Sequence, residues 1–156
     1  MLRRSCLFLV VALGWLCIAC DPDGTGAIGI RAEPGDGLAV KIRGCDDETR
    51  LLSFRIRDTE ADMTVWEIES LSGLVDPIFK VGETPNEFTE VIHLNRALSK
   101  DRAYLFSASF SNEGRAVAEL VPDEADSTRW LVGGIYKVDG KRLTDAEFDA
   151  ADVCDP

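Results

Sequence analysis

The cysteines are the side chains of this sequence whose positions indicate the best-defined chemistry. A thiol can form a disulfide or take a covalent modification, and the chain has 5 cysteines. Cys6 and Cys17 lie in an apolar N-terminal segment, and removal of that segment would leave Cys20, Cys45 and Cys154. If that segment is an export signal, the three remaining thiols leave one without a disulfide partner. If Cys20 is modified, Cys45 and Cys154 can form a disulfide; two isolated buried thiols are the alternative.

Catalytic chemistry has little support in the sequence. Neither Cys45 nor Cys154 belongs to a Cys-x-x-Cys pair, so a redox or zinc role is not indicated. His93 is the only histidine, and its place in an alternating segment is more typical of a solvated or hydrogen-bonded residue than of a base. No Gly-x-Ser-x-Gly motif is present to hold a serine nucleophile. We therefore expect no catalytic residue and no enzymatic activity.

Three groups of carboxylates offer oxygen atoms of the kind that calcium prefers. They are Asp46-Asp47-Glu48, Asp123-Glu124-Asp126 and Asp145-Glu147-Asp149. None has the spacing of an EF-hand loop, so we expect solvated turns and a helix N-terminus, and no metal ligand. Weak calcium binding remains an alternative.

A literal Gly-x-Gly-x-x-Gly pattern spans residues 24–29. This pattern binds a pyrophosphate only where it follows a strand and opens a helix. Here it leads into Ile28-Gly29-Ile30-Arg31, which alternates like a strand. We therefore expect no nucleotide and no other cofactor.

The charge balance excludes several classes of partner. The chain has 17 Lys and Arg against 28 Asp and Glu, for a net charge of -11. Removal of an N-terminal segment with Arg3 and Arg4 leaves 15 basic residues against 28 acidic ones, for a net charge of -13. A nucleic-acid partner and an anionic membrane surface are disfavoured, since both need a basic face. A hydrophobic content of 46% argues against a disordered acidic tail.

The N-terminus has the layout of an export signal. Met1 to Arg4 is a short basic region, and Leu7 to Leu13 is an apolar one. The apolar run from Cys6 to Cys20 is shorter than the roughly 20 residues that a membrane-spanning helix needs. We therefore expect a signal peptide over residues 1–19 and an exported protein.

The segment Cys17-Ile18-Ala19-Cys20 resembles the lipobox of bacterial lipoproteins. This resemblance implies that Cys20 is diacylated and becomes the mature N-terminus, anchored to the outer face of the bacterial cell membrane. Lipoboxes usually have Leu where this chain has Cys17, so ordinary signal-peptidase cleavage remains the alternative.

The rest of the chain divides into a tether and a domain. Residues 20–36 are rich in Gly, Pro and Asp, a composition typical of flexible linkers and turns. We therefore expect a flexible tether over 20–36 and a folded domain over 37–156.

Short segments of alternating apolar and polar residues predict the folded domain. They occupy residues 38–43, 52–57, 63–68, 88–94, 104–110, 117–121 and 130–138, with Gly, Pro, Asn and Asp between them. About seven or eight short strands at these intervals are typical of an antiparallel β-sandwich. Thr144 and Glu147 form a capping-box pattern ahead of an apolar stripe that includes Phe148, which predicts a short C-terminal helix. This helix ends at Cys154, and a bond to Cys45 would attach it to the sandwich.

The segment from Leu98 to Tyr104 resembles the corner before the F strand in fibronectin type III and related immunoglobulin-like domains. In those folds the tyrosine hydroxyl bonds to backbone upstream. The resemblance implies an antiparallel immunoglobulin-like β-sandwich with a short C-terminal helix. Residues 65–68 and 79–85 also resemble small lipoproteins of high-GC Gram-positive bacteria, a group that lends no catalytic residue.

These observations predict a lipid-anchored, surface-exposed and non-catalytic binding or accessory domain. We expect it to contact the membrane through its N-terminal lipid. Its ligand would be a protein, a small molecule or cell-wall material. A small exported hydrolase is the alternative function.

Overall fold

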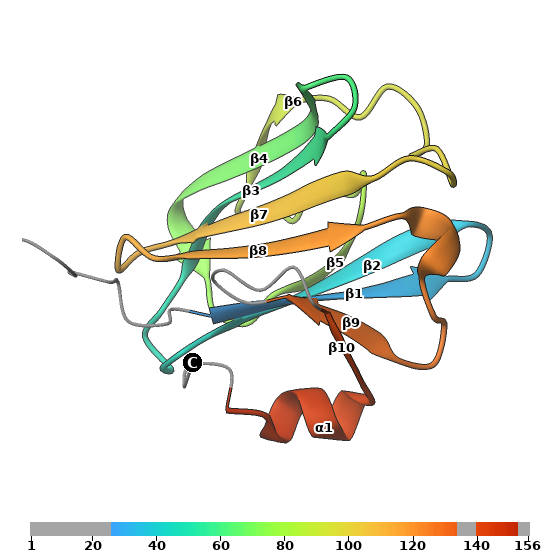
Figure 1. Ribbon diagram of the computed structural model, residues 1–156. Helices are drawn as coiled ribbons and strands as arrows, with labels where there is room; N and C mark the ends of the chain where they lie inside the picture. Colours follow the sequence, from blue (N-terminus) through green and yellow to red (C-terminus); the bar gives the residue numbers. More distant parts are fainter. Residues whose placement is uncertain (1–25, 134–139, 153–156) are drawn as a thin grey trace, which may run out of the picture.

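Two antiparallel five-stranded sheets pack face to face in the computed structural model, which describes residues 26–133 and 140–152 (Figure 1). The first sheet has the order β10-β9-β1-β2-β5, and the second has the order β6-β4-β3-β7-β8. The elements are β1 (Gly26–Glu33), β2 (Gly37–Gly44), β3 (Leu51–Asp58), β4 (Met63–Leu74), β5 (Ile78–Lys80), β6 (Thr89–Ile92), β7 (Tyr104–Phe110), β8 (Arg115–Leu120), the 3-10 helix η1 (Pro122–Glu124), β9 (Trp130–Gly133), β10 (Lys141–Leu143) and α1 (Asp145–Ala150). This architecture confirms the predicted mainly β fold, an antiparallel sandwich with a short C-terminal helix.

Alternation along the strands explains how the two sheets face each other. In β7, Tyr104, Phe106, Ala108 and Phe110 are buried, and the residues between them are half-buried. Side chains of a strand point alternately to its two faces, so one face of β7 belongs to the core. No helix of the described residues is long and apolar enough to cross a membrane.

Aromatic rings from both sheets meet at the centre of the core. Phe79 of the first sheet lies 5.2 Å from the ring of Phe54 in the second, edge to face. Trp66 lies 5.9 Å from Phe54 and 6.1 Å from Phe79. Each such aromatic pair adds about 0.5–1.5 kcal/mol to the effect of burial. The rings therefore join the two sheets.

Strand β1 corrects the prediction of a flexible tether over residues 20–36. Residues 26–33 of that range pair along their whole length with β2, and part of them pairs with β9. Glycine is needed inside the strand because a Cβ at Gly29 would lie 2.9 Å from Cε2 of Phe148. The Gly-rich composition thus reflects close packing, and the folded domain includes Gly26 instead of starting at residue 37. Residues 20–25 lie outside the described residues.

Helix α1 confirms the predicted capping box. The Thr144 side chain accepts a hydrogen bond from the Glu147 backbone N–H, and Glu147 Oε2 accepts one from the Thr144 backbone N–H at 2.7 Å. Phe148 is fully buried, with its ring centre 6.0 Å from that of Trp130. The helix therefore packs on the outer face of the first sheet, and a small second core lies beneath it.

Cations of the first sheet also contact α1. Arg31 pairs with Asp145 at 3.1 Å, and its guanidinium lies 4.3 Å from the Trp130 ring centre. Lys41 pairs with Asp149. Each pair joins a cation that is half-buried or buried to an exposed carboxylate of the helix, and the burial of Phe148 adds an apolar contact to them.

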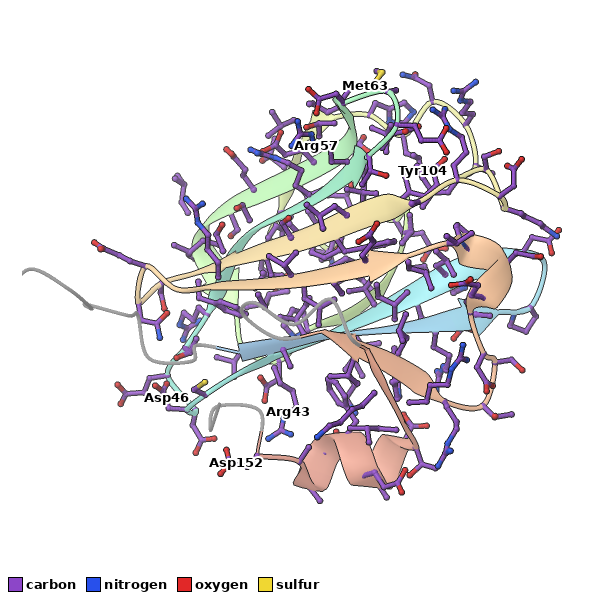
Figure 2. All side chains as sticks on the ribbon, in the orientation of Figure 1. Arg43, Asp46, Arg57, Met63, Tyr104 and Asp152 are labelled. Atoms are coloured by element: carbon purple, nitrogen blue, oxygen red, sulfur yellow. The ribbon has the colours of Figure 1, made fainter. Side chains whose placement is uncertain are left out.

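The sandwich has two ends, which we call proximal and distal. Gly26, where β1 begins, pairs with Gly44 at the proximal end, and Glu33, where β1 stops, pairs with Gly37 at the distal end. Strand β3 starts after β2 and runs to the distal end, where Asp58 pairs with Tyr104. Figure 1 shows β1 running from one end to the other, and Figure 2 shows Asp46 at the proximal end, with Met63 and Tyr104 toward the distal one.

Candidate functional site

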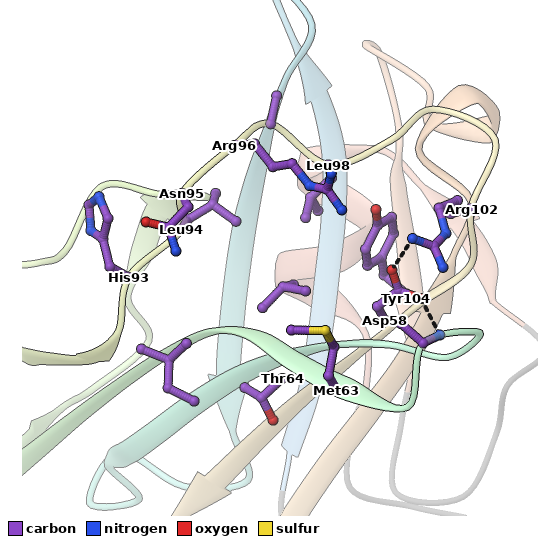
Figure 3. Close-up of a pocket in the computed structure, with 14 residues that line it drawn as sticks. Asp58, Met63, Thr64, His93, Leu94, Asn95, Arg96, Leu98, Arg102 and Tyr104 are labelled. Atoms are coloured by element: carbon purple, nitrogen blue, oxygen red, sulfur yellow. Dashed lines mark hydrogen bonds and ion pairs between the residues drawn. The ribbon is translucent and has the colours of Figure 1, made fainter.

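A cavity of about 180 Å³ at the distal end is the candidate ligand site (Figure 3). It lies between the β3–β4 turn and the segment 93–103, which leads from β6 to β7. Its apolar wall includes Met63, Val65, Ile92, Leu94 and Leu98. Its polar lining includes Asp58, His93, Asn95, Arg96, Arg102 and Tyr104. We call it the distal cavity.

A buried ion pair forms one side of the distal cavity. The Asp58 side chain is 3% exposed and lies 2.8 Å from Nη1 of Arg102. Asp58 Oδ1 also accepts hydrogen bonds from the backbone N–H groups of Glu60 and Ala61, at 3.1 and 2.9 Å. Burying a carboxylate is costly unless its oxygens are satisfied, and here they are. Asp58 therefore joins the β3–β4 turn to the start of β7.

Tyr104 lies on the same side of the cavity, next to Asp58 (Figure 3). Its hydroxyl oxygen accepts a hydrogen bond from the Ser99 backbone N–H at 2.9 Å. This contact confirms the predicted bond between the tyrosine hydroxyl and upstream backbone. The segment leading into β7 is thereby attached to the core, because Tyr104 itself is buried.

His93 lies at the rim and forms a pair with Glu90. Its Nδ1 is 2.7 Å from Oε2 of Glu90, and its side chain is 70% exposed. The other Glu90 oxygen accepts a hydrogen bond from Nε1 of Trp66 at 2.8 Å. In the part of the chain that the structure describes, no hydroxyl or thiol bonds to His93. The pair thus orients the β6 edge, with no nucleophile beside the histidine.

Acidification is expected to lower the stability of the fold, and Glu90 is expected to contribute. Hydrogen bonds from His93 and then Trp66 lower the pKa of Glu90 below its ordinary value of 4.5. A lowered folded-state pKa gives stability that is present above the unfolded pKa and is lost as the pH falls through the folded value. The melting temperature of Glu90→Gln should therefore fall less than that of the parent chain between about pH 7 and pH 3.

Circular dichroism melts at several pH values measure this effect. Glu87→Gln is the matched control, because Glu87 is exposed and makes no hydrogen bond with a described residue. It should keep the parent profile. A Glu90→Gln profile that also coincides with the parent would contradict the assignment.

A second hollow of about 380 Å³ lies on the other side of the same segment. It shares Leu94, Ala97 and Leu98 with the distal cavity. Lys100 reaches Asp36 at 2.8 Å beside it. The hydrogen bond to Asp36, and then the negative charges of Asp36 and Asp123, raise the pKa of Lys100. The Lys100 ammonium at the edge of this hollow is therefore already paired with a carboxylate.

The carboxylate groups noted in the sequence serve local structure. Asp46 Oδ1 accepts hydrogen bonds from the Thr49 hydroxyl and from the backbone of Glu48 and Thr49, and these lower its pKa. Asp126 accepts bonds from the Thr128 backbone and hydroxyl, which likewise lower its pKa. Within residues 26–133 and 140–152, no three His, Cys, Asp or Glu side chains are grouped to hold a metal ion.

The cysteines of the sequence prediction are only partly covered by the structure. Cys45 directly follows β2 at the proximal end. Cys20 and Cys154 lie outside the described residues. Lipidation of Cys20 and the pairing of Cys45 with Cys154 therefore stay predictions.

Asp58, Arg96 and Arg102 were missed as site residues from the sequence. The sequence does hold a signal for Asp58, because this residue continues the inward-facing alternation of Phe54 and Ile56. A charged residue at an inward position needs a partner. The arginines have no such local signal, since segment 93–103 has no periodicity.

Comparison with known proteins gives no relative. No protein-family model, no curated protein and no solved structure matches the chain.

Proposed function

We propose that the chain is an exported, lipid-anchored and non-catalytic binding domain whose distal end faces away from the membrane. The direction of β1 is the observation that carries this proposal. Gly26 stands at the proximal end, six positions after Cys20. Six residues span at most roughly 20–22 Å, so a lipid on Cys20 would keep the proximal end close to the bilayer.

The distal cavity would then be held well clear of the membrane surface. Strand β1 has 8 residues. At about 3.3 Å per residue such a strand extends roughly 26 Å. A protein, a small molecule or cell-wall material could therefore reach the distal cavity without competing with lipid headgroups.

We also propose an immunoglobulin-like or fibronectin III-like relationship for the sandwich. Strands β3, β7 and β8 are neighbours in that order, like strands C, F and G of immunoglobulin domains. Tyr104 begins β7, which corresponds to strand F, and its hydroxyl bond to Ser99 is that of a tyrosine corner. The lipobox pattern supports a place among the small bacterial lipoproteins.

The absence of catalysis is supported by the contacts of the titratable side chains. Asp58 is paired with Arg102, and His93 is paired with Glu90. A general base needs a nucleophile or a substrate proton within hydrogen-bond reach. Among the described residues His93 bonds to Glu90 and to no hydroxyl or thiol, which supports a binding role over nucleophilic catalysis.

A quenching experiment on the full chain tests anchor and orientation together. A fluorophore is attached to a cysteine placed at the proximal end (Arg115→Cys) or at the distal end (Asn95→Cys). The labelled protein is then reconstituted into vesicles whose lipids carry a nitroxide quencher on the headgroup. Arg115 pairs with Ser109, far along β7 from Tyr104, and both labelled positions are exposed. We expect strong quenching at 115 and little at 95.

Cys20→Ala is the matched control, with Cys17→Ala as its counterpart. Cys20→Ala should abolish quenching at both sites and move the protein out of the membrane fraction. Cys17→Ala should behave like the parent, and mass spectrometry should find a diacylglyceryl group on Cys20. Equal quenching at 95 and 115 would overturn the orientation. A membrane-bound Cys20→Ala chain would overturn the anchor.

A further inference from the structure

We propose that the distal cavity binds an apolar group about the size of a benzene ring that carries one carboxylate, and that Arg96 holds the carboxylate. This inference rests on the proposed function, because it takes the distal end as the binding end. It adds the chemical class of the ligand. The volume of the cavity limits the size of the ligand, its wall limits the polarity of the ligand, and its charged side chains limit the charge of the ligand.

The volume limits the size of the bound group. The cavity measures about 180 Å³. An apolar cavity of about 150 Å³ accommodates benzene, whereas sites for drug-sized ligands measure roughly 300–1,000 Å³. The cavity therefore fits a single ring or a short branched chain.

The wall requires that this group be apolar. Val65, Leu94 and Leu98 line the cavity and also pack against the main core. Met63, which is 55% exposed, stands at the rim. A hydroxyl or amide pressed against this wall would lose its hydrogen bonds to water, which costs free energy. A small sugar or a bare inorganic ion is thereby disfavoured.

The two arginines that line the cavity favour a ligand with a negative charge. Arg102 is already engaged by Asp58 at 2.8 Å and by Glu60 at 3.3 Å. Arg96 is exposed and forms no hydrogen bond or ion pair with any described residue, and Figure 3 shows it among the residues around the cavity. A guanidinium can bind a carboxylate through two parallel hydrogen bonds. Arg96 is thus the group left to meet an anionic ligand.

A single charge suits the site better than a phosphate does. Of the two arginines that line the cavity, only Arg96 has no partner among the described residues. The carboxylates of Glu60 and Glu90 lie next to the cavity, because their partners Arg102 and His93 line it. A phosphate monoester carries about two negative charges near neutral pH. Repulsion by these carboxylates would therefore act on a phosphate about twice as strongly as on a carboxylate.

The site is also largely formed before a ligand arrives. The Asp58–Arg102 pair holds the β3–β4 turn, and the Tyr104–Ser99 bond holds the segment that carries Arg96. Binding to a preformed site avoids the entropy loss of ordering loops. A small ligand can therefore bind measurably.

Saturation-transfer difference NMR on the full chain in nanodiscs tests the proposal, with empty nanodiscs as the blank. The probes are phenylacetate, its neutral analogue phenylacetamide, the cation phenethylamine and phenyl phosphate. We expect saturable binding of phenylacetate and at least about tenfold weaker binding of the other three, because a hydrogen bond to a charged group is lost or repulsion is added.

Variants assign the contacts. Arg96→Gln should weaken phenylacetate binding about tenfold or more, whereas Arg115→Gln, an exposed arginine at the proximal end, should leave it unchanged. Ala61→Phe adds a ring to the cavity lining and should abolish binding while the melting temperature stays near the parent value. N-acetyl-glycyl-phenylalanine tests the source: tighter binding than phenylacetate indicates a peptide C-terminus, and weaker binding indicates a free acid.

Three outcomes would overturn the proposal. They are no saturable phenylacetate signal, equal binding of phenylacetamide or phenyl phosphate, and unchanged affinity in Arg96→Gln. The quenching experiment tests the lipid on Cys20 and the orientation of the domain, and none of these three outcomes changes its result. A wrong ligand can therefore be told apart from a wrong proposed function.

Discussion

Reduction of a Cys45–Cys154 disulfide is expected to lower the free energy of unfolding by about 2–5 kcal/mol. The bond would close a loop of roughly 100 residues, and in the chain-entropy model such a loop gives a value near the top of this range. The described residues already bring the two chain segments together. Arg43 Nη1 donates to the carbonyl of Phe148 at 2.6 Å and to that of Ala151 at 3.0 Å.

Those two contacts join residues next to both cysteines. Arg43 lies two positions before Cys45, and Ala151 lies three positions before Cys154. A disulfide needs Cα atoms within about 7 Å. The approach of β2 to the C-terminal end of α1 therefore favours this pairing over two isolated thiols.

Urea unfolding of the full chain, with and without reductant, measures the effect. Cys154→Ser should lower the midpoint as far as reduction does, and reductant should not lower it further in that variant. Thiol alkylation before reduction supplies a count of reactive cysteines. If reductant leaves the midpoint of the parent chain in place, the pairing is wrong and packing alone holds α1.

Phe148→Ala is expected to cost about 3–5 kcal/mol, the range for removing a fully buried phenylalanine ring. The ring is 0% exposed, lies beside Trp130 and covers Gly29. Its removal leaves a cavity between β1 and α1. The loss should appear both in urea unfolding and as a shift in fluorescence when Trp130 becomes exposed.

Asp149→Asn is the matched control on the same helix. It removes the ion pair with Lys41 but keeps Phe148 in place. The Asp149 side chain is 58% exposed but that of Lys41 is only 10% exposed, so removing this pair should cost about 1–2 kcal/mol, still less than removing the ring. A Phe148→Ala cost as small as that of Asp149→Asn would mean that α1 is held by its charges and by Arg43.

The elements with strong local signals could be predicted from the sequence. Strand β7 has apolar residues at every second position, and the capping box of Thr144 and Glu147 lies directly ahead of an apolar stripe. These signals depend on residues a few positions apart, so short-range geometry is enough to produce them. The Tyr104 contact was expected from the resemblance of residues 98–104 to immunoglobulin-like domains, and it too is local, since Ser99 is five residues away.

Strand β1 had a weaker local signal, because only Ile28 to Arg31 alternates like a strand and the sequence around it has the composition of a linker. Its glycines indicated a linker, because Gly usually lowers strand stability. What makes Gly29 favourable in β1 is Phe148, more than 100 positions later in the chain. Only the packing of α1 on the first sheet decides that a small residue is required there.

The sequence by itself thus determined the class of fold and the short C-terminal helix, because short-range patterns indicate both, and its resemblance to immunoglobulin-like domains indicated the tyrosine contact. Only the tertiary structure decided the extent of the domain and the composition of the distal cavity. Asp58 ends β3, whereas Arg96 and Arg102 both lie in the segment between β6 and β7. The pairing of β3 with β7 brings Asp58 to Arg102, and Arg96 is left without a partner among the described residues. Long-range strand pairing determines such a site, and no local pattern of residue types encodes it.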